Sequence, residues 1–207
     1  MADFAAIVLA GGAGRRLGGA DKPARRVGGR TMLARVLDAV ADAEPRIVVG
    51  PPSTLGLPIG VRATTERPPG GGPVAAVAAG LALVPNAVRS VAVLAADLPM
   101  LTTDAMAALR ATLSMVDGAL FVDADGRRQL LCGVWRAVAL RHALDAVAAA
   151  RGGELAGAAM RAVVERLAVA EVAWSDAGPP PWFDCDTDDD LRKARRWAGD
   201  ADEEEAR

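Results

Sequence analysis

The feature that most constrains this chain is a short apolar run that breaks directly into a glycine-rich loop. The run, Phe4 to Leu9, is far too short to cross a membrane, and it predicts a buried strand. The loop begins at once and holds five glycines, at positions 11, 12, 14, 18 and 19. Small residues there let the backbone approach a ligand closely. The start of the chain therefore predicts a ligand loop directly after the first strand of an α/β fold.

The loop has the composition of a polyphosphate-binding segment. Exposed backbone N–H groups can face phosphate oxygens, and Arg15, Arg16 and Lys22 add cationic donors. A Walker loop is excluded because Gly19 is followed by Ala20 and Asp21 instead of lysine. A dinucleotide fingerprint that starts at Gly12 would need glycine at position 17, which is Leu17. A plain glycine-rich turn remains the alternative.

Strand-like and helix-like segments alternate along the rest of the chain, which predicts a parallel sheet covered by helices. The expected fold class is α/β with three layers, Rossmann-like, with a mostly parallel central sheet and helices on both faces. We expect one domain over residues 1–198 and a disordered acidic tail over 199–207. Further strands are expected at 46–49, 90–95, 119–122, 130–135 and 167–174. Helices are expected at 32–43, 74–84, 103–114, 137–150 and 154–165, and after Thr187, with Thr31 and Thr102 as caps.

Composition excludes several classes of protein. The 207 residues carry a net charge of −2, which argues against a general nucleic-acid binder with a broad basic surface. Two cysteines, Cys132 and Cys185, are too few for a disulfide framework or a metal cluster, and we expect structural thiols in a reducing cytoplasm. No basic region precedes the first apolar run, so neither a signal peptide nor a membrane partner is expected. We expect the protein to be located in the cytoplasm.

A second informative element is the segment AADLPML, in which Asp97 follows the apolar run at 91–95 after one further alanine. Ligands of open α/β sheets collect at the carboxyl ends of strands, so Asp97 can converge with the glycine loop if the two strands are neighbours. Mg²⁺ prefers carboxylate and phosphate oxygens, which would give Asp97 a role as a metal ligand. The alternative is an aspartate that caps the turn before Pro99.

The third element is the acidic segment FDCDTDDDL, from Phe183 to Leu191. Thr187 is a suitable helix N-cap, and Asp188 to Asp190 would favour the positive end of that helix without any further function. Asp184 and Asp186 precede the helix. Asp186 could therefore supply a second carboxylate to a metal held by Asp97.

Taken together, LAGG-x-x-x-R-L-G-G-x-D-K-P, the Asp97 segment and FDCDTDDDL resemble the nucleotidyltransferases, most closely the molybdenum cofactor guanylyltransferases. The resemblance runs from Phe4 to about Leu191 and implies a nucleotidyltransferase fold. It implies Mg²⁺ as cofactor, with Asp97 as its ligand, and Arg16, Lys22 and Asp97 as catalytic residues. The nucleotide-binding residues that it implies are Leu9, Ala10, Gly11, Gly12, Lys22, Glu66, Gly72, Pro73 and Asp97.

Several positions depart from the family pattern. Glu66 stands where the family has aspartate, Ala76 replaces a glycine, and Gly50 stands where an asparagine commonly follows the second strand. Asp186 also occurs in related cytidylyltransferases. Those enzymes usually read LAAG where this chain reads LAGG, and the missing methyl group could leave room for a purine, so guanine is preferred.

The implied reaction is transfer of GMP from GTP to the terminal phosphate of molybdopterin, the organic part of the molybdenum cofactor, with release of pyrophosphate. A phosphate dianion can attack without a protein base, and His142 is expected to be an ordinary helix residue. The surface turns at 28–30 and 125–129 could contribute on the acceptor side, although Arg127 and Arg128 are expected to be solvated. Delivery of an unstable cofactor suggests transient contacts with other proteins of the same pathway.

Other functions stay open at this point. CTP could replace GTP, or another small phosphorylated acceptor could replace molybdopterin. A protein of a different class would bind a nucleotide for regulation without catalysis. A dehydrogenase ranks last, because its glycine fingerprint is broken at Leu17.

Overall fold

The computed structural model describes residues 3–11, 22–51, 56–175 and 178–200. Within these residues the main sheet has seven strands, of which six run in one direction and β8 is reversed. The prediction of a mostly parallel sheet is therefore confirmed. In spatial order the strands are β5 (Val61–Thr64), β4 (Arg46–Val49), β1 (Phe4–Leu9), β6 (Ser90–Ala95), β8 (Arg128–Arg136), β7 (Gly118–Val122) and β9 (Val169–Ala173).

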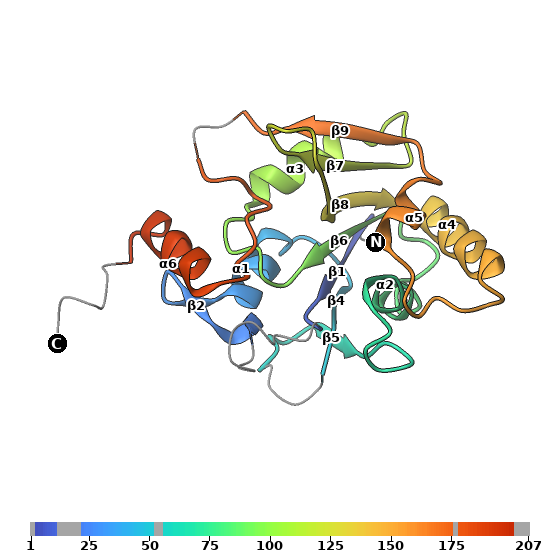
Figure 1. Cartoon of the computed structure of the whole chain (residues 1–207), viewed down its shortest axis with the longest axis horizontal. Helices are drawn as coiled ribbons and strands as arrows, with labels where there is room; N and C mark the ends of the chain where they lie inside the picture. The colour runs from blue at the N-terminus through green and yellow to red at the C-terminus, as the bar shows by residue number, and fades with distance from the viewer. Residues whose placement is uncertain (1–2, 12–21, 52–55, 176–177, 201–207) are drawn as a thin grey trace.

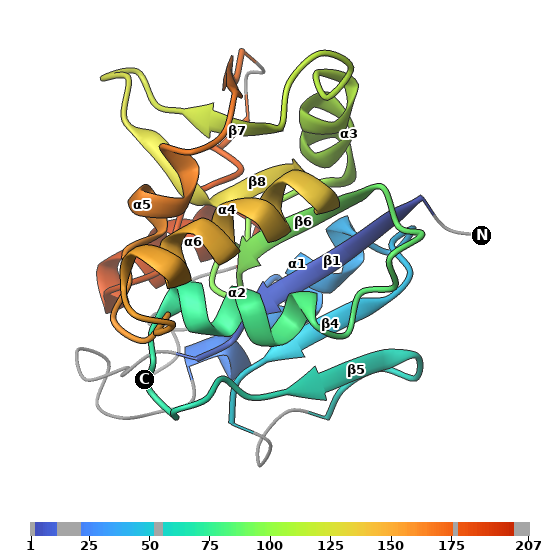
Figure 2. The ribbon, with the colours of Figure 1, turned by 90° about the vertical axis from the view of Figure 1, so that its right-hand side faces the viewer.

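Helices cover both faces of the sheet and give three layers, as the sequence predicts (Figure 1). One face is covered by α2 (Pro73–Leu81), α4 (Ala137–Ala150) and α5 (Met160–Val164), which lie together in front of the sheet in Figure 2. The other face is covered by α1 (Met32–Ala39) and α3 (Thr103–Ala111).

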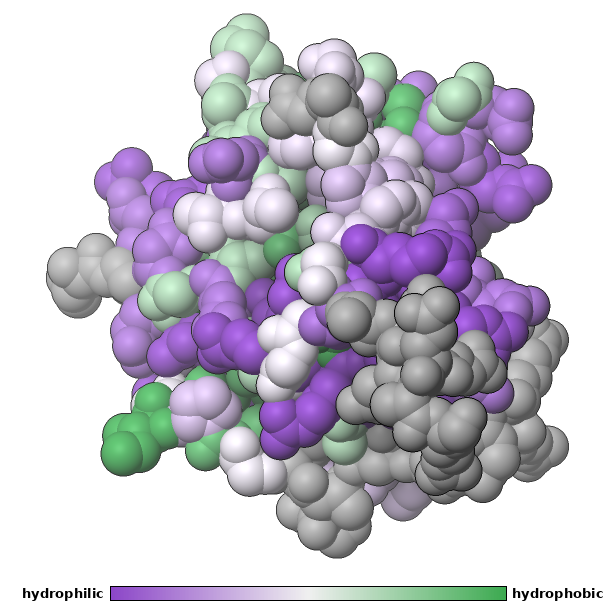
Figure 3. Space-filling model, turned by 90° about the vertical axis from the view of Figure 1, so that its left-hand side faces the viewer, coloured by the Kyte–Doolittle hydropathy of each residue, from purple (hydrophilic) through white to green (hydrophobic). Residues whose placement is uncertain are grey.

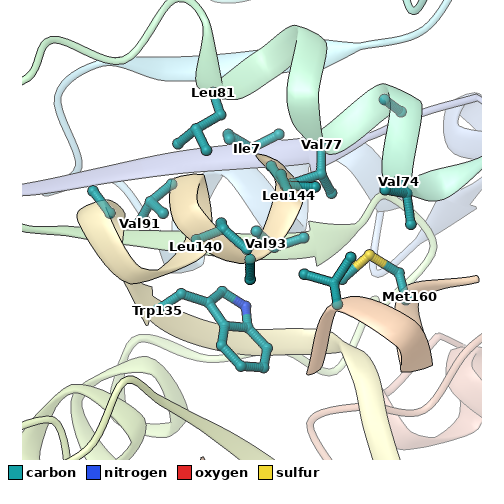
Figure 4. Close-up of a cluster of buried hydrophobic side chains, with 14 of the residues drawn as sticks. Ile7, Val74, Val77, Leu81, Val91, Val93, Trp135, Leu140, Leu144 and Met160 are labelled. Atoms are coloured by element: carbon teal, nitrogen blue, oxygen red, sulfur yellow. The ribbon is translucent and has the colours of Figure 1, made fainter. Parts of the chain in front are cut away.

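The core is divided by the sheet because neighbouring residues of a strand point to opposite faces. Ile7 of β1 packs with Leu81 of α2 and Trp135 of β8 on one face, in the cluster that Figure 4 draws. Phe4 and Val8, on the opposite face of the same strand, pack with residues of α1 and α3. All six residues of β1 are buried, which explains why this strand reads as a continuous apolar run.

Side-chain caps begin two helices where the sequence predicts them. The hydroxyl of Thr31 accepts a hydrogen bond from the Ala34 N–H, and the hydroxyl of Thr102 accepts one from the Ala105 N–H, each at 3.1 Å. The ends of these helices are less well predicted. α1 ends at Ala39 and α3 at Ala111, three or four residues before the expected ends at 43 and 114.

The helix expected over 154–165 is only half correct, since α5 begins at Met160. Gly157 has a positive φ of 70°, which interrupts a helical path. Its N–H donates to the carbonyl of Gly71 at 2.8 Å, so this backbone group bonds across the fold instead of along a helix. Alanine-rich composition favours a helix here, but the tertiary contact decides the structure.

A small subdomain lies beside the main sheet on the α1 side. It joins the short helix η2 (Lys22–Ala24), a hairpin of β2 (Arg26–Val27) and β3 (Arg30–Thr31), and α6 (Asp188–Trp197). Val27 and Leu191 share a small apolar cluster between hairpin and helix. The face of the molecule on this side is mostly hydrophilic (Figure 3). In the part of the chain that is described, no helix is long and apolar enough to cross a membrane.

Candidate active site

The strands that carry the first two motifs are direct neighbours. β1 pairs with β6 in parallel register, with Leu9 opposite Ala95, and the carbonyl of Leu9 accepts the Ala96 N–H at 3.0 Å. β4, the next strand of the main sheet along the chain, lies on the other side of β1. Ligands bind where the strand order reverses in this way. Gly11 and Asp97 therefore lie at the same carboxyl edge of the sheet, as the sequence predicts.

Lys22 joins the second and third motifs at this edge. Its Nζ donates to the carboxylate of Asp97 and, at 2.6 Å, to Oδ1 of Asp186. Lys22 and Asp97 have side-chain exposures of 16% and 20%, whereas Asp186 is 55% exposed and faces the open side. Burial alone would lower the pKa of Lys22, but the hydrogen bonds and negative charges of Asp186 and Asp97 outweigh it and raise that pKa. The lysine is thus a fixed positive charge.

Three further contacts hold this centre in place, and sequence reasoning missed all of them. The Cys185 N–H donates to the carbonyl of Asp97 at 3.2 Å, which ties the third motif to the second. Arg35 of α1 donates from Nε to the carbonyl of Pro99 at 2.6 Å. Arg25 and Asp188 form an ion pair at 2.7 Å, so one of the aspartates expected only to initiate α6 also anchors the Lys22 segment.

Asp184 lies close enough to Lys22, Asp97 and Asp186 for their charges to shift its pKa. Partial burial and the negative charges of Asp186 and Asp97 raise the pKa of Asp184 above its ordinary value. Among the described residues the centre therefore brings three carboxylates, those of Asp97, Asp184 and Asp186, close to the Lys22 ammonium. Burial also raises the pKa of Cys132 and Cys185 to about 12, in keeping with structural thiols.

Of the expected nucleotide-binding residues on the α2 side, Glu66 lies beside Gly11, and Gly72 and Pro73 begin α2. A Cβ placed on Gly11 would lie 3.9 Å from Oε1 of Glu66, and the same oxygen accepts the Gly70 N–H at 3.1 Å. Gly72 caps α2 with φ 88° and ψ 179°, a conformation essentially restricted to glycine, and Pro73 begins the helix. Glu66 and the start of α2 thus follow one another on the segment between β5 and α2.

Gly50, where the family commonly has asparagine, leaves no space for a side chain. A Cβ there would come within 2.9 Å of the carbonyl carbon of Ala10. Ala10 in turn donates its N–H to the Val49 carbonyl at 2.8 Å, so its backbone is fixed. A side chain at position 50 would therefore require the Ala10 backbone to move.

The remaining predicted residues fall into two groups. Gly12 and Arg16 lie outside the described residues. His142 is exposed on α4, in agreement with an ordinary helix residue.

Among the described residues no group of three or more His, Cys, Asp or Glu side chains could hold a metal ion, so Asp97 and Asp186 are at most a pair.

A lysine between two carboxylates thus lies at the switch point of a mostly parallel sheet, at the same edge as Gly11. Residues 6–172 match the family model of the MobA-like NTP transferase domain. The chain belongs to this family of nucleotidyltransferases. Enzymes of the family generally require a divalent metal ion.

Individual relatives agree with this assignment. A molybdenum cofactor guanylyltransferase of Bradyrhizobium is 34% identical over 204 residues, which cover 93% of this chain and 92% of the relative. A molybdenum cofactor guanylyltransferase of Mesorhizobium japonicum is 31% identical over 212 residues, which cover 94% of this chain and 95% of the relative. The structure of molybdopterin-guanine dinucleotide biosynthesis protein A from Archaeoglobus fulgidus superposes with a TM-score of 0.70 at 19% identity, and covers 95% of this chain and 99% of that one. This last similarity confirms the fold class.

Proposed function

We propose that this enzyme transfers GMP from GTP to the terminal phosphate of molybdopterin in the molybdenum cofactor and releases pyrophosphate. The observation that carries the proposal is the Lys22 ammonium between Asp97 and Asp186 at the carboxyl edge of the sheet. The names of the relatives supply the substrates: the chain is 34% identical to a molybdenum cofactor guanylyltransferase over almost its whole length.

The chemistry needs orientation and charge neutralisation more than it needs a base. A terminal phosphate with a second pKa of about 6 is largely dianionic at neutral pH and can attack the α-phosphate of GTP directly. The oxygen of the acceptor phosphate forms the new P–O bond, and pyrophosphate leaves with the electrons of the bond that breaks. Lys22 would stabilise the charge that develops on the α-phosphate and the leaving group.

The two carboxylates fit a divalent cation. Asp97 and Asp186 both reach the same Nζ atom, so their oxygens lie close enough together for one ion to contact both. Mg²⁺ commonly binds through one or two carboxylates plus substrate phosphates, and a pair of aspartates matches that preference. When bound, Mg²⁺ would neutralise charge on the α-phosphate and the pyrophosphate. We assign Asp97 as the principal ligand because it is more buried, and Asp186 as the second.

The nucleotide would lie along the rim formed by Gly11, Glu66, Gly72 and Pro73. Gly11 is exposed and lets the backbone approach the ligand, and Gly72 exposes the positive end of α2, whose first residue is Pro73. Glu66 places a carboxylate oxygen beside Gly11. A carboxylate can accept hydrogen bonds from a ribose or from a base with N–H donors.

The test is pyrophosphate release with GTP, CTP or ATP, with and without Mg²⁺, in the presence of molybdopterin or its molybdenum-loaded form. We expect release that is selective for GTP and depends on both Mg²⁺ and acceptor. A preference for CTP would assign the enzyme to the cytidylyltransferases. Nucleotide binding with no release under any condition would favour the regulatory alternative. We place the reaction in the cytoplasm, with transient contacts to the proteins that supply and receive the cofactor.

A further inference from the structure

The segment that carries Asp184 and Asp186 to the active site has no helix or strand of its own. It covers residues 178–187 and leads into α6 from the side of β9 (Figure 1). Both aspartates are exposed, and Asp186 reaches back to Lys22 at 2.6 Å. Because no helix or sheet ladder holds the segment, its position depends on the contacts that its individual residues make with the rest of the fold.

Trp182 attaches this segment to the main sheet. Its ring packs on Phe121 of β7, with 5.2 Å between the ring centroids and 35° between the ring planes. Phe121 is completely buried in the core on the α1 and α3 side of the sheet, and Trp182 packs against the same core. Trp174, which follows β9, contacts Phe121 edge-on at 5.6 Å. Phe121 is therefore a rigid base for the ring of Trp182.

The contact between Trp182 and Phe121 lies near the active-site edge of the sheet. β8 is antiparallel to both β6 and β7, so β6 and β7 run in the same direction. Phe121 is the last residue but one of β7, and Asp97 follows the end of β6 at the same edge. Four residues of chain, which span at most about 14 Å, separate Trp182 from Asp186. The aromatic contact is thus a nearby support for the Asp186 carboxylate.

The residues after Trp182 connect the segment to the small subdomain and to the Asp97 loop. Phe183 packs on Trp197 of α6, with 4.8 Å between the ring centroids. Cys185 is buried in the cluster that the hairpin and α6 share, and its N–H donates to the Asp97 carbonyl at 3.2 Å. The segment therefore contacts the sheet first and the subdomain next. A shift of Trp182 would move the subdomain side of the site relative to Asp97.

We propose that Trp182 is a positioning residue for metal binding, because its ring on Phe121 sets the place of the Asp186 carboxylate relative to that of Asp97. The inference rests on the proposed function, since it concerns the cation that these two carboxylates would hold. Mg²⁺ demands a near-ideal octahedral arrangement of oxygens, so a displaced second ligand weakens its binding. Trp182 acts through Asp186 and leaves the chemical step at saturating Mg²⁺ intact.

A double-mutant cycle between Trp182 and Asp186 tests this role. The readout is the Mg²⁺ concentration that gives half the maximal rate at saturating GTP and acceptor. Trp182→Ala and Asp186→Asn should each raise it about fivefold, and the double variant no more than about tenfold, because Asp186 contributes little once its support is lost. The kcat at saturating Mg²⁺ and the GTP KM should stay near the wild-type values. Trp182→Phe, which keeps a ring on Phe121, should restore the Mg²⁺ dependence.

Trp174→Ala is the matched control. It removes the same type of side chain from the same Phe121 ring, but Trp174 lies outside the segment that carries Asp186. We expect a lower urea midpoint and an unchanged Mg²⁺ dependence. Its effect should add to that of Asp186→Asn without coupling.

Hydrogen exchange of the Cys185 amide, followed by NMR, gives a readout that needs no metal, nucleotide or turnover. This N–H is bonded to the Asp97 carbonyl, so its protection reports how firmly the segment is held against the Asp97 loop. Trp182→Ala should speed the exchange about tenfold, whereas Trp174→Ala should not. If Trp182→Ala does not fold, Trp182→Leu keeps an apolar side chain in the core and should change both readouts in the same direction.

The outcomes separate this inference from the proposed function. Fully additive effects of Trp182→Ala and Asp186→Asn, or exchange of the Cys185 amide at the wild-type rate in Trp182→Ala, would overturn the inference alone. An equal change in Trp174→Ala would also overturn it, because the effect would then reflect a general loss of packing. Absence of Mg²⁺-dependent release in the wild type would contradict the proposed function, and the exchange rates would still decide whether Trp182 holds the segment.

Discussion

Lys22 and Asp186 are 164 positions apart in the sequence, and their Nζ and Oδ1 atoms lie 2.6 Å apart. This bond joins a segment near the start of the chain to one near its end. Asp97, from the middle of the chain, binds the same lysine. The centre is therefore assembled from three distant segments and exists only when the sheet, the hairpin and α6 are all in place.

Lys22→Ala should lower kcat about 10²–10³-fold, the range seen when one donor to a developing negative charge is removed. The loss reflects charge that is no longer stabilised on the α-phosphate and leaving pyrophosphate. Steady-state pyrophosphate release measures it, with circular dichroism to verify the fold. Lys193→Ala removes the same charge from the outer surface of α6, where Lys193 lies over Phe183 and Trp197, and should keep near-normal turnover. Equal losses in both variants would refute the role of Lys22.

Asp97→Asn should raise the Mg²⁺ concentration required for half-maximal rate by at least about tenfold, because a neutral amide is a much weaker ligand for a hard cation. Asp186→Asn should shift it less, since Asp186 is the more exposed of the pair. The measurement is a Mg²⁺ titration of the rate at saturating GTP. Asp189→Asn, on the outer surface of α6, is the control. Near-normal activity and an unchanged Mg²⁺ dependence in Asp97→Asn would contradict the assignment of Asp97 as a metal ligand.

Asp184→Asn should stabilise the protein at neutral pH. The folded state raises the pKa of Asp184 above its ordinary 3.8, so folding favours the protonated form. This contribution to stability is present below pH 3.8 and is lost as pH rises through the folded-state pKa. At pH 7 the charged carboxylate therefore carries a cost that asparagine lacks. Urea midpoints at pH 7 and pH 4 should show an advantage of the variant that shrinks toward pH 4, and an advantage independent of pH would contradict the account.

Gly72→Ala should destabilise the fold by about 1–3 kcal/mol, because its φ of 88° and ψ of 179° are strained for any residue with a Cβ. Moving the start of α2 should also raise the GTP KM. Gly178→Ala is the matched control, since Gly178 has no positive φ and a Cβ there meets nothing within 4 Å. Denaturant titration and GTP kinetics check both effects. If the Gly72→Ala variant matches the Gly178→Ala variant in stability and in GTP KM, Gly72 does not help to bind the nucleotide.

Elements with a strong local signal could be predicted to the residue. The strand Phe4–Leu9 is apolar throughout because both faces are covered, and the helix Ala137–Ala150 is a long run of good helix formers. The strand Val61–Thr64 was missed, since it is short, lies at the sheet edge and exposes Arg62. The hairpin of β2 and β3 was missed because two-residue strands carry no periodicity.

In the candidate site, residues that stand in sequence motifs could be predicted, whereas residues that act only through tertiary contacts could not. Lys22, Asp97 and Asp186 could be singled out because each stands in a motif, and the structure brings all three together. Arg35 could not, because an arginine inside a helix gives no sign that its guanidinium will reach the Pro99 carbonyl.

The most direct test of the central claim follows the α-phosphate of GTP. Enzyme, Mg²⁺, the molybdenum-loaded acceptor and GTP labelled at the α-phosphate are mixed, and the products are separated. The account predicts that the label moves into an acceptor–guanine dinucleotide, with one pyrophosphate released for each label transferred, and that Asp97→Asn suppresses both together. Label that stays in GTP, or appears as free GMP without a dinucleotide, would contradict the claim that this centre performs nucleotidyl transfer to the acceptor.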